Sequence, residues 1–536
     1  MTAAAPSSDT RLQQNTAQHE EANAEARNAT RGGLVVLLAK LVFIVGGLAQ
    51  KILLPRVIGM EGFGAFGRMS ALPNILNNVT VSATIMGVSK AVASSPDPKA
   101  TQRQALRVHA LIALALGASL FLAAPFIADF QRAPGMTTGL RVMSGVLAAY
   151  GLYAACVGVL NGTRRFVAQA GFDITYTGLR TVLMLGGAWL AMRASVRGEV
   201  GAALGIVAAS SLILIASYAL VGRGSATQTG VSDRSYLMTL LPVAGVQLVA
   251  NVLMQVDIIL LGRVLTPEGA TPEQTAGVNL WCGYYQAAQV FAFLPYQLSF
   301  AVTQVLLPSV ARAYANKDVE LTRTQVLRGV RWGLLLVGLL SGTIVFLNGN
   351  AVSLLFGREA GGATRDVVRW LCVAQGLFAM LAVGQTVLVA VDRRKEALTV
   401  SLITLAAVGF GFLSLGGTHL AATTGSMLEM FSVPPQQLLL VQVSQRMAAA
   451  MALGALCSAF VVAKYVPKSL PLATAARVAG WVLLAAAAGA AMGTLGKIAT
   501  IAAAAAAAAA YVVFLIVSRE FGPGELAGMT KLLKRR

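Results

Sequence analysis

"ILLPRVIGMEG" occupies residues 52–62, and "ILLGRVLTPEG" occupies residues 259–269. Isoleucine, two leucines, arginine, valine, glutamate and glycine recur in register between the two stretches. Chance similarity between two apolar segments would seldom preserve the arginine, the glutamate and the glycine at the same spacing. The two stretches therefore indicate an internal duplication.

The composition around these stretches is that of a membrane protein. Of the 536 residues, 56% are hydrophobic and 12% are charged, whereas soluble domains carry about 25% charged residues. The mean hydropathy is +0.69. Soluble domains of this length could not bury so much apolar surface, so lipid is the expected solvent.

A helix needs about 20 mainly apolar residues to cross a bilayer, and about fourteen stretches of the chain meet this requirement. The expected spans are 33–56, 69–93, 107–128, 139–161, 166–192, 200–222, 236–262, 276–308, 330–348, 367–391, 397–416, 438–463, 474–495 and 498–518. Pro295 predicts a kink or a re-entry within the eighth span. The stretch 417–437 is expected to be a loop.

A second pair of similar stretches indicates the size of the duplicated unit. "TQRQALR" at 101–107 resembles "TRTQVLR" at 322–328, and both precede a predicted span. The two pairs predict a six-helix unit written twice, and an even number of spans makes the two copies parallel. The expected fold is an all-α polytopic membrane protein of two such repeats plus two C-terminal helices. Its parts are a polar tail at 1–32, six-helix bundles at 33–222 and 236–463, extra helices at 474–518 and a basic tail at 519–536.

The positive charges predict the orientation. If the N-terminus is cytoplasmic, the loops on that side hold roughly twice as many Lys and Arg as the opposite loops, which is the bias that orients membrane proteins. Both termini are therefore expected in the cytoplasm. The net charge of +20 is spread over many short loops and not gathered into one basic domain, so no nucleic-acid partner is expected.

Two motifs resemble a known superfamily. "GFGAFGRMSALPNILNNVTVSATIMGVSKAVAS" at 62–94 and "GVLNGTRRFVAQAG" at 158–171 are similar to the flippases of the multidrug/oligosaccharidyl-lipid/polysaccharide (MOP) superfamily. The resemblance implies a transporter that works by alternating access of two bundles. Its polysaccharide repeat-unit and lipid II branches have fourteen helices, whereas its drug-extruding relatives usually have twelve.

One departure bears on the branch. Lipid II flippases usually place arginines after the "LPN" turn and along the first helix. Here Asn77 and Asn78 follow that turn, and the first predicted helix carries Gln50 and Lys51. The departure favours a different lipid-linked saccharide.

Amide side chains predict a polar passage through the spans 236–262 and 276–308. Amides both donate and accept hydrogen bonds, so they suit sugar hydroxyls. The alternative is that they hold neighbouring helices together. The candidate substrate ligands of this kind are Asn77, Asn78, Gln247, Asn251, Gln255, Asn279, Gln286 and Gln297.

Charged residues within the predicted spans are functional candidates, because burying them in lipid is costly. Arg180 lies near the middle of its span, and a guanidinium fits the oxygens of a pyrophosphate; the alternative is a buried ion pair that only fixes packing. Lys40 is a second candidate ligand. Asp173 and Asp257 are candidates for coupling to a proton or sodium gradient.

These features predict a flippase that moves a polyprenyl-pyrophosphate-linked oligosaccharide across a bacterial inner membrane for cell-surface polysaccharide assembly. Its partners would be that substrate, membrane lipids and a glycan polymerase or synthase. A lipid II flippase, a multidrug or cation antiporter and a membrane scaffold for glycan synthesis are the alternatives. The sequence has no ATP-binding motif and no catalytic or metal-ligand spacing among its three His and four Cys, so we expect neither an enzyme nor a cofactor, and the energy would come from an ion gradient or the membrane potential.

Overall fold

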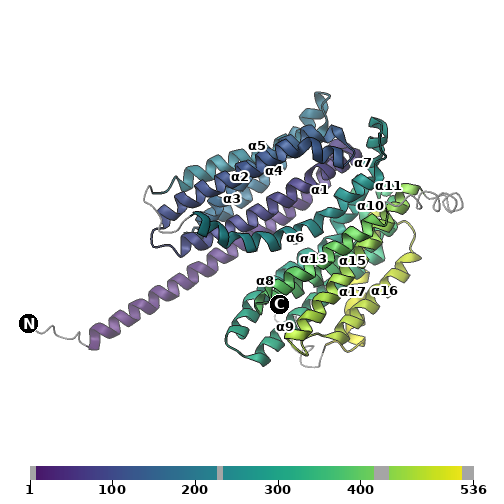
Figure 1. The fold of residues 1–536 in the computed structure, drawn as a ribbon. Coiled ribbons are helices and arrows are strands. Elements are labelled where there is room, and N and C mark those ends of the chain that lie inside the picture. Colours follow the sequence, from purple (N-terminus) through teal and green to yellow (C-terminus); the bar gives the residue numbers. More distant parts are fainter. Residues whose placement is uncertain (1–7, 226–232, 416–433, 522–536) are drawn as a thin grey trace, which may run out of the picture. The chain divides into compact units, whose positions relative to one another are not determined.

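A computed structural model describes residues 8–225, 233–415 and 434–521 (Figure 1). Within these ranges the regular structure is helical and includes no strand. Twelve helical stretches are long and apolar enough to cross a membrane. The predicted class, an all-α polytopic membrane protein, is confirmed.

In chain order the helices are α1 (Ser8–Ala93), α2 (Pro98–Phe130), the short η1 (Pro134–Met136), α3 (Thr137–Gly162), α4 (Phe166–Arg193), α5 (Gly198–Val221), α6 (Asp233–Leu265), α7 (Pro272–Ala292), α8 (Leu294–Ala315), α9 (Val319–Leu347), α10 (Gly349–Phe356), α11 (Arg358–Ala363), α12 (Arg365–Ala390), α13 (Arg394–Leu413), α15 (Pro435–Tyr465), α16 (Leu472–Ala490) and α17 (Lys497–Val517).

Every predicted span falls on a helix. The described residues contain twelve helical stretches able to cross a membrane, whereas the sequence predicts fourteen spans. Of the twelve stretches, 41–93 is 53 residues long and holds the first two predicted spans. The helical path is broken there only at Gly59, with φ 74° and ψ 173°, a conformation that glycine adopts without strain. Helix α4 matches the predicted span 166–192 but is not among the twelve, because its polar residues lower its hydropathy.

The predicted irregularity at Pro295 is a kink. Helix α7 ends at Ala292 and α8 begins at Leu294, and Phe293 between them keeps helical angles of φ −76° and ψ −14°. The ring of Pro295 therefore interrupts the hydrogen bonding without reversing the chain.

The predicted loop 417–437 and the basic tail 519–536 lie mostly outside the described residues. The helical backbone of α1 already begins at Ser8, within the predicted polar tail.

The chain packs as two compact units. The first comprises residues 1–57, 76–124 and 137–247, and the second comprises 58–75, 125–136 and 248–536. Helices α1, α2 and α6 each contribute to both units. This division follows contacts and not the sequence repeat, so the repeat boundaries at 33–222 and 236–463 stay a prediction.

In the first unit, glycines bring α4 and α5 into backbone contact. A Cβ added at Gly201 would lie 2.3 Å from the carbonyl oxygen of Gly187, and one at Gly205 would lie 2.0 Å from that of Leu183. Such spacing of small residues lets membrane helices approach closely. Helix α5 also packs on α3.

In the second unit, α12 packs against α8, α9 and α15, while α16 and α17 lie beside α9 (Figure 1). The Tyr511 hydroxyl of α17 donates to the Leu335 carbonyl of α9 at 3.0 Å. Gly342 of α9 leaves room for the indole of Trp481 in α16, since a Cβ there would lie 2.0 Å from its Nε1.

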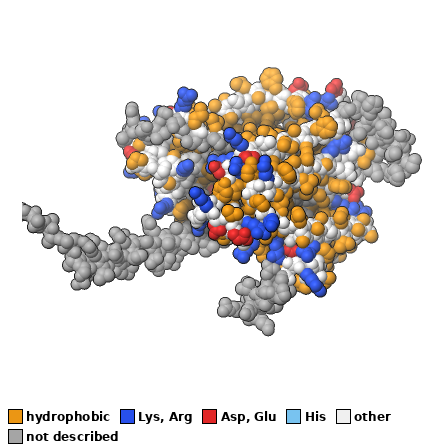
Figure 2. Space-filling model, turned by 60° about the horizontal axis from the view of Figure 1, so that its bottom comes forward, with side chains coloured by type: hydrophobic (Ala, Val, Ile, Leu, Met, Phe, Trp, Pro, Cys, Tyr) orange, Lys and Arg blue, Asp and Glu red, His pale blue; other side chains and the backbone are white. Residues whose placement is uncertain are grey.

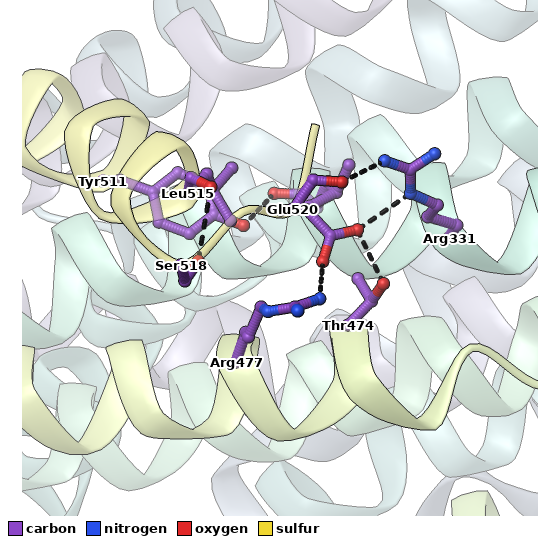
Figure 3. Close-up of polar contacts among 8 residues, drawn as sticks. Arg331, Thr474, Arg477, Tyr511, Leu515, Ser518 and Glu520 are labelled. Atoms are coloured by element: carbon purple, nitrogen blue, oxygen red, sulfur yellow. Dashed lines mark hydrogen bonds and ion pairs between the residues drawn. The ribbon is translucent and has the colours of Figure 1, made fainter. Parts of the chain in front are cut away.

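A buried carboxylate fastens the end of α17 (Figure 3). Glu520 accepts from Arg331 at 2.8 Å, from Arg477 at 2.5 Å and from Thr474 at 2.7 Å, and its side chain is 1% exposed. Arg331 belongs to α9, whereas Thr474 and Arg477 belong to α16. One carboxylate therefore ties three helices together.

The surface outside these cores is largely hydrophobic (Figure 2). Large apolar side chains such as Phe126, Leu413 and Phe460 are more than 70% exposed. Lipid is the solvent in which such side chains carry no penalty.

Candidate functional site

In the first unit a close contact between α1 and α4 positions two cations. Gly46 faces Thr177, whose methyl carbon would lie 2.2 Å from an added Cβ. One helical turn further along each helix, the Gln50 amide donates to the Thr181 hydroxyl at 2.8 Å. These contacts bring Lys51, which is exposed, within electrostatic range of Arg180.

Arg180 is half-buried, and its Nε is buried without a hydrogen-bond partner. Among the described residues it forms no ion pair, and its charged neighbour across the α1–α4 contact is Lys51, which repels it. The guanidinium also lies close enough to Tyr150 to interact with it electrostatically. Two adjacent like charges at this depth would be stabilised by an anion.

Asp173 does not neutralise Arg180. No ion pair joins the two side chains in the part of the chain that the structure describes. Asp173 instead accepts a hydrogen bond from the Tyr153 hydroxyl at 3.3 Å. The alternative in which Arg180 and this aspartate form a packing pair is therefore not the observed arrangement.

Three tyrosines form the wall next to Arg180. The rings of Tyr150 and Tyr176 are stacked with centroids 4.6 Å apart, and Tyr153 lies 5.3 Å from Tyr150. The Tyr153 hydroxyl donates to Asp173 and the Tyr176 hydroxyl is bonded to the Ser210 hydroxyl, and both side chains are buried. Half-buried Tyr150, which interacts electrostatically with Arg180, is therefore the member of this group that can hydrogen-bond a ligand. The arrangement can bind an anion and hydrogen-bond hydroxyl groups attached to it.

The second unit contains an arginine that sequence reasoning missed. Arg68 is 0% exposed, and its guanidinium donates to the Asn279 amide oxygen at 2.9 Å, the Gln131 carbonyl at 2.8 Å, and the Gly262 carbonyl and Thr266 hydroxyl at 3.2 Å each. Gln131 follows the end of α2, and Gly262 lies in the last turn of α6.

Carbonyl groups at helix C-termini carry partial negative charge and lack partners within the helix, so they suit a buried cation. Glycine at 262 makes the approach possible, because a Cβ there would lie 2.4 Å from Arg68 Nε. Arg68 therefore joins segments of α1, α2, α6 and α7 and acts in packing.

Two predicted sugar ligands of α7 take part in the same packing. Asn279 accepts from Arg68, and Gln286 donates to the Phe63 carbonyl at 3.0 Å. Gly64 and Gly67 of α1 fit against these two residues, with added Cβ atoms 1.8 Å from the Asn279 carbonyl oxygen and 2.0 Å from the Gln286 amide. In this conformation both amides hold helices together, and their role as sugar ligands stays a prediction.

Asp257 is fully buried in the second unit. It accepts hydrogen bonds from the Tyr285 hydroxyl at 2.9 Å and from the Gln289 amide at 2.7 Å, both on α7. Among the described residues it forms no ion pair. A carboxylate held by neutral donors can take up a proton or a small cation, which suits the ion-coupling role predicted for it.

The remaining candidates lie on α1, α6 and α8. Asn251 is buried, and Asn77 has a buried amide oxygen without a hydrogen-bond partner. Half-buried Gln247 and Gln255 lie on α6, exposed Asn78 on α1 and exposed Gln297 on α8, past the kink. The Lys40 side chain lies outside the described part of the structure.

The sequence contains a feature that could have identified Lys51 and Arg68, which the sequence analysis did not propose as site residues. Lys51 and Arg68 are single charges in otherwise apolar stretches, "GGLAQKILL" and "GFGAFGRMSAL". Sequence alone does not distinguish an arginine that binds a ligand from one that caps helix ends.

The comparisons with known proteins match this architecture. Residues 53–360, more than half of the chain, match the family model described as polysaccharide biosynthesis protein. No curated protein sequence matches the chain. A solved structure titled lipid II flippase MurJ, inward closed conformation, superposes with a TM-score of 0.69 at 14% identity, covering 91% of this chain and 99% of that one.

Two other solved structures are more distant. An inward-facing multidrug resistance transporter of the MATE family gives a TM-score of 0.59 at 16% identity, covering 80% of this chain and 98% of its own. A MOP superfamily transporter from Pyrococcus furiosus, described as having a binding pocket of reverse polarity, gives a TM-score of 0.52 at 15% identity, covering 81% of this chain and 95% of its own. The chain has the MOP transporter fold, and it belongs to the polysaccharide biosynthesis protein family.

Proposed function

We propose that this protein flips a polyprenyl-pyrophosphate-linked oligosaccharide across a bacterial inner membrane, for assembly of a cell-surface polysaccharide. The observation that carries the proposal is Arg180, a half-buried cation with no acidic partner among the described residues and with Lys51 beside it. A pyrophosphate would supply a counter-charge for Arg180, and a guanidinium binds its oxygens in a forked geometry.

The neighbouring groups suit the rest of the head group. The hydroxyl group of half-buried Tyr150 can hydrogen-bond a sugar hydroxyl next to the pyrophosphate. The head group would cross by alternating access of the two predicted bundles, driven by an ion gradient or the membrane potential, with Asp257 or Asp173 as the coupling group. A glycan polymerase or synthase would take up the delivered product.

A lipid II flippase is the second candidate. It is favoured by the likeness to the solved structure of that name, which covers 91% of this chain, and by the fourteen helices that the sequence predicts. Both candidates carry a polyprenyl pyrophosphate, so the cationic cluster serves either. Asn77 and Asn78, where lipid II flippases usually place arginines, favour a different saccharide.

A cation antiporter fits the cluster less well. Lys51 and Arg180 would repel a cationic drug placed against α1 and α4, and Asp173 is engaged by Tyr153. The likeness to drug transporters is therefore assigned to the shared fold.

The test is transport by the purified full chain in proteoliposomes. A polyprenyl-pyrophosphate-linked repeat unit, lipid II and a quaternary ammonium drug are offered in turn, and translocation is followed with a reagent that cannot cross the bilayer. We expect the repeat unit to be moved fastest. Faster movement of lipid II would favour the second candidate, and movement of the drug alone would refute the proposal.

A further inference from the structure

The first unit has a cavity of about 630 Å³ between α2, α3 and α5, a volume within the usual range of ligand sites. One end is lined by Arg103 and Arg107 near the start of α2 and by Arg223 just after α5. The other end is lined by apolar side chains, including Ala110 of α2 and Leu214 of α5. The cavity is therefore cationic at one end and apolar at the other.

The cationic end is built by specific contacts. The Gln102 amide donates to the carbonyls of Val221 and Gly222 at 3.0 Å each. Gly224, with φ +77°, fits against α2, since a Cβ there would lie 2.4 Å from the Lys99 carbonyl oxygen. These bonds fasten the chain after α5 to the start of α2 and so hold Arg223 beside Arg103.

The charge at this end is only partly compensated. Arg107 forms an ion pair with Asp233 at 2.6 Å. Arg103 and Arg223 are exposed and form no ion pair with any residue that the structure describes. Among the described residues, only one of the three guanidinium groups has a carboxylate partner, so this end has an excess positive charge complementary to an anion.

The apolar end is open to the membrane side of α5. Ile215 is 66% exposed and Tyr218 is 37% exposed, and both line the cavity. Tyrosine is the side chain that prefers the boundary between head groups and hydrocarbon. The order along α5, from isoleucine through tyrosine to arginine, matches the order of acyl chain, glycerol region and phosphate in a lipid.

We propose that this cavity binds one anionic membrane phospholipid, with its phosphate held by Arg103 and Arg223 and an acyl chain lying along Leu214 and Ile215. Basic pockets between membrane helices bind anionic head groups in this way. The inference goes beyond the proposed function, because the occupant is a resident lipid and not the transported substrate, and its test does not depend on transport.

The experiment is lipid binding to the full chain in detergent, measured by native mass spectrometry. Phosphatidylglycerol and phosphatidylcholine with the same acyl chains are titrated separately. We expect phosphatidylglycerol to bind more tightly. The double variant Arg103→Gln/Arg223→Gln should weaken that binding about 30-fold, from two lost charges near the membrane surface, and leave phosphatidylcholine unaffected.

Two matched controls separate a site from general attraction. Arg312→Gln/Arg328→Gln removes the same charge from exposed positions of α8 and α9 and should leave phosphatidylglycerol binding unchanged. Ala219→Trp fills the cavity and should weaken binding, whereas Ala216→Trp, on exposed α5 surface outside the cavity lining, should not.

Several results would overturn the proposal. These are equal binding of the two phospholipids, an equal loss in the two double variants, and an equal effect of the two tryptophan variants. Displacement of phosphatidylglycerol by a polyprenyl diphosphate that binds more tightly would also overturn it, because the cavity would then belong to the transported substrate.

Discussion

Arg68 and Arg180 are both arginines within membrane helices, but their surroundings differ. The first donates to four acceptors at the ends and sides of other helices, whereas the second has a repelling lysine as its charged neighbour across the α1–α4 contact. A cation that donates hydrogen bonds to acceptors within the protein stabilises the fold. A cation without such partners is available to a ligand, and the proposed function rests on this contrast.

The role of Arg68 in packing predicts a loss of stability on substitution. Arg68→Ala should destabilise the folded protein by about 3 kcal/mol or more, because it leaves buried acceptors without a donor. Arg68→Lys should recover little, since an ammonium cannot reach four separated acceptors. The thermal midpoint in detergent measures the effect, with exposed Arg141→Ala as the control. Equal midpoints for the wild type and Arg68→Ala would refute the packing role.

At the scale of elements, α16 and α17 are fastened to the second unit at both ends. Glu520 ties one end to α9, as Figure 3 shows. At the other end, the Asn348 amide donates to the Gly489 carbonyl at 2.8 Å and the Asn350 amide to the Gly493 carbonyl at 3.0 Å. The pair is therefore expected to move with α9 as one body.

The Glu520 cluster predicts a pH dependence. Burial raises the pKa of Glu520, but the hydrogen bonds from Thr474, Arg331 and Arg477 outweigh it and hold the pKa below its ordinary value. A lowered folded pKa means that the stabilisation is complete above the ordinary pKa, about 4.3, and is lost as the pH falls through the lowered value.

Thermal midpoints measured from pH 7 down to pH 3 should therefore fall less steeply in Glu520→Gln than in the wild type. The variant should also have a lower midpoint at pH 7, because the two arginines lose their counter-charge. Identical pH profiles would show that this carboxylate contributes nothing through its charge. Exposed Glu320→Gln serves as the control.

The alanine run of α17 makes a prediction about transport. Ala507 faces the packed side, whereas Ala505 and Ala509 are exposed. A polyprenyl tail needs an apolar route while its head group crosses the membrane, and we propose that these last two helices line it. We expect Ala505→Leu/Ala509→Leu to slow flipping without preventing insertion, and Ala507→Leu to lower the thermal midpoint instead. If the double variant flipped the lipid at the wild-type rate, the exposed face of α17 would not line the route of the lipid tail.

At the scale of the whole molecule, the charge bias predicts both termini in the cytoplasm. Topology reporters fused after Arg234 and after Arg536 should both report the cytoplasmic side. A periplasmic signal from either fusion would contradict the orientation and would require a different number of membrane crossings.

The sequence predicted most of the helical architecture, because apolar run length and proline position act locally. The positions of the helices and the kink before Pro295 follow from such signals. The Arg68 network could not be predicted, since its partner Asn279 lies 211 residues away. For the same reason sequence did not reveal that Asn279 and Gln286 hold helices together in this conformation, nor that α1, α2 and α6 contribute to both compact units.

The most direct test of the account is the affinity of the full chain for a polyprenyl-pyrophosphate-linked saccharide. Arg180→Ala should weaken binding roughly 10- to 100-fold, the value of about one hydrogen bond to a charged group. Arg180→Lys should retain part of the affinity, and Arg193→Ala, an exposed arginine on the same helix, should bind as the wild type does. If Arg180→Ala and Arg193→Ala bound this lipid as tightly as the wild type, the cationic cluster would not be the pyrophosphate site.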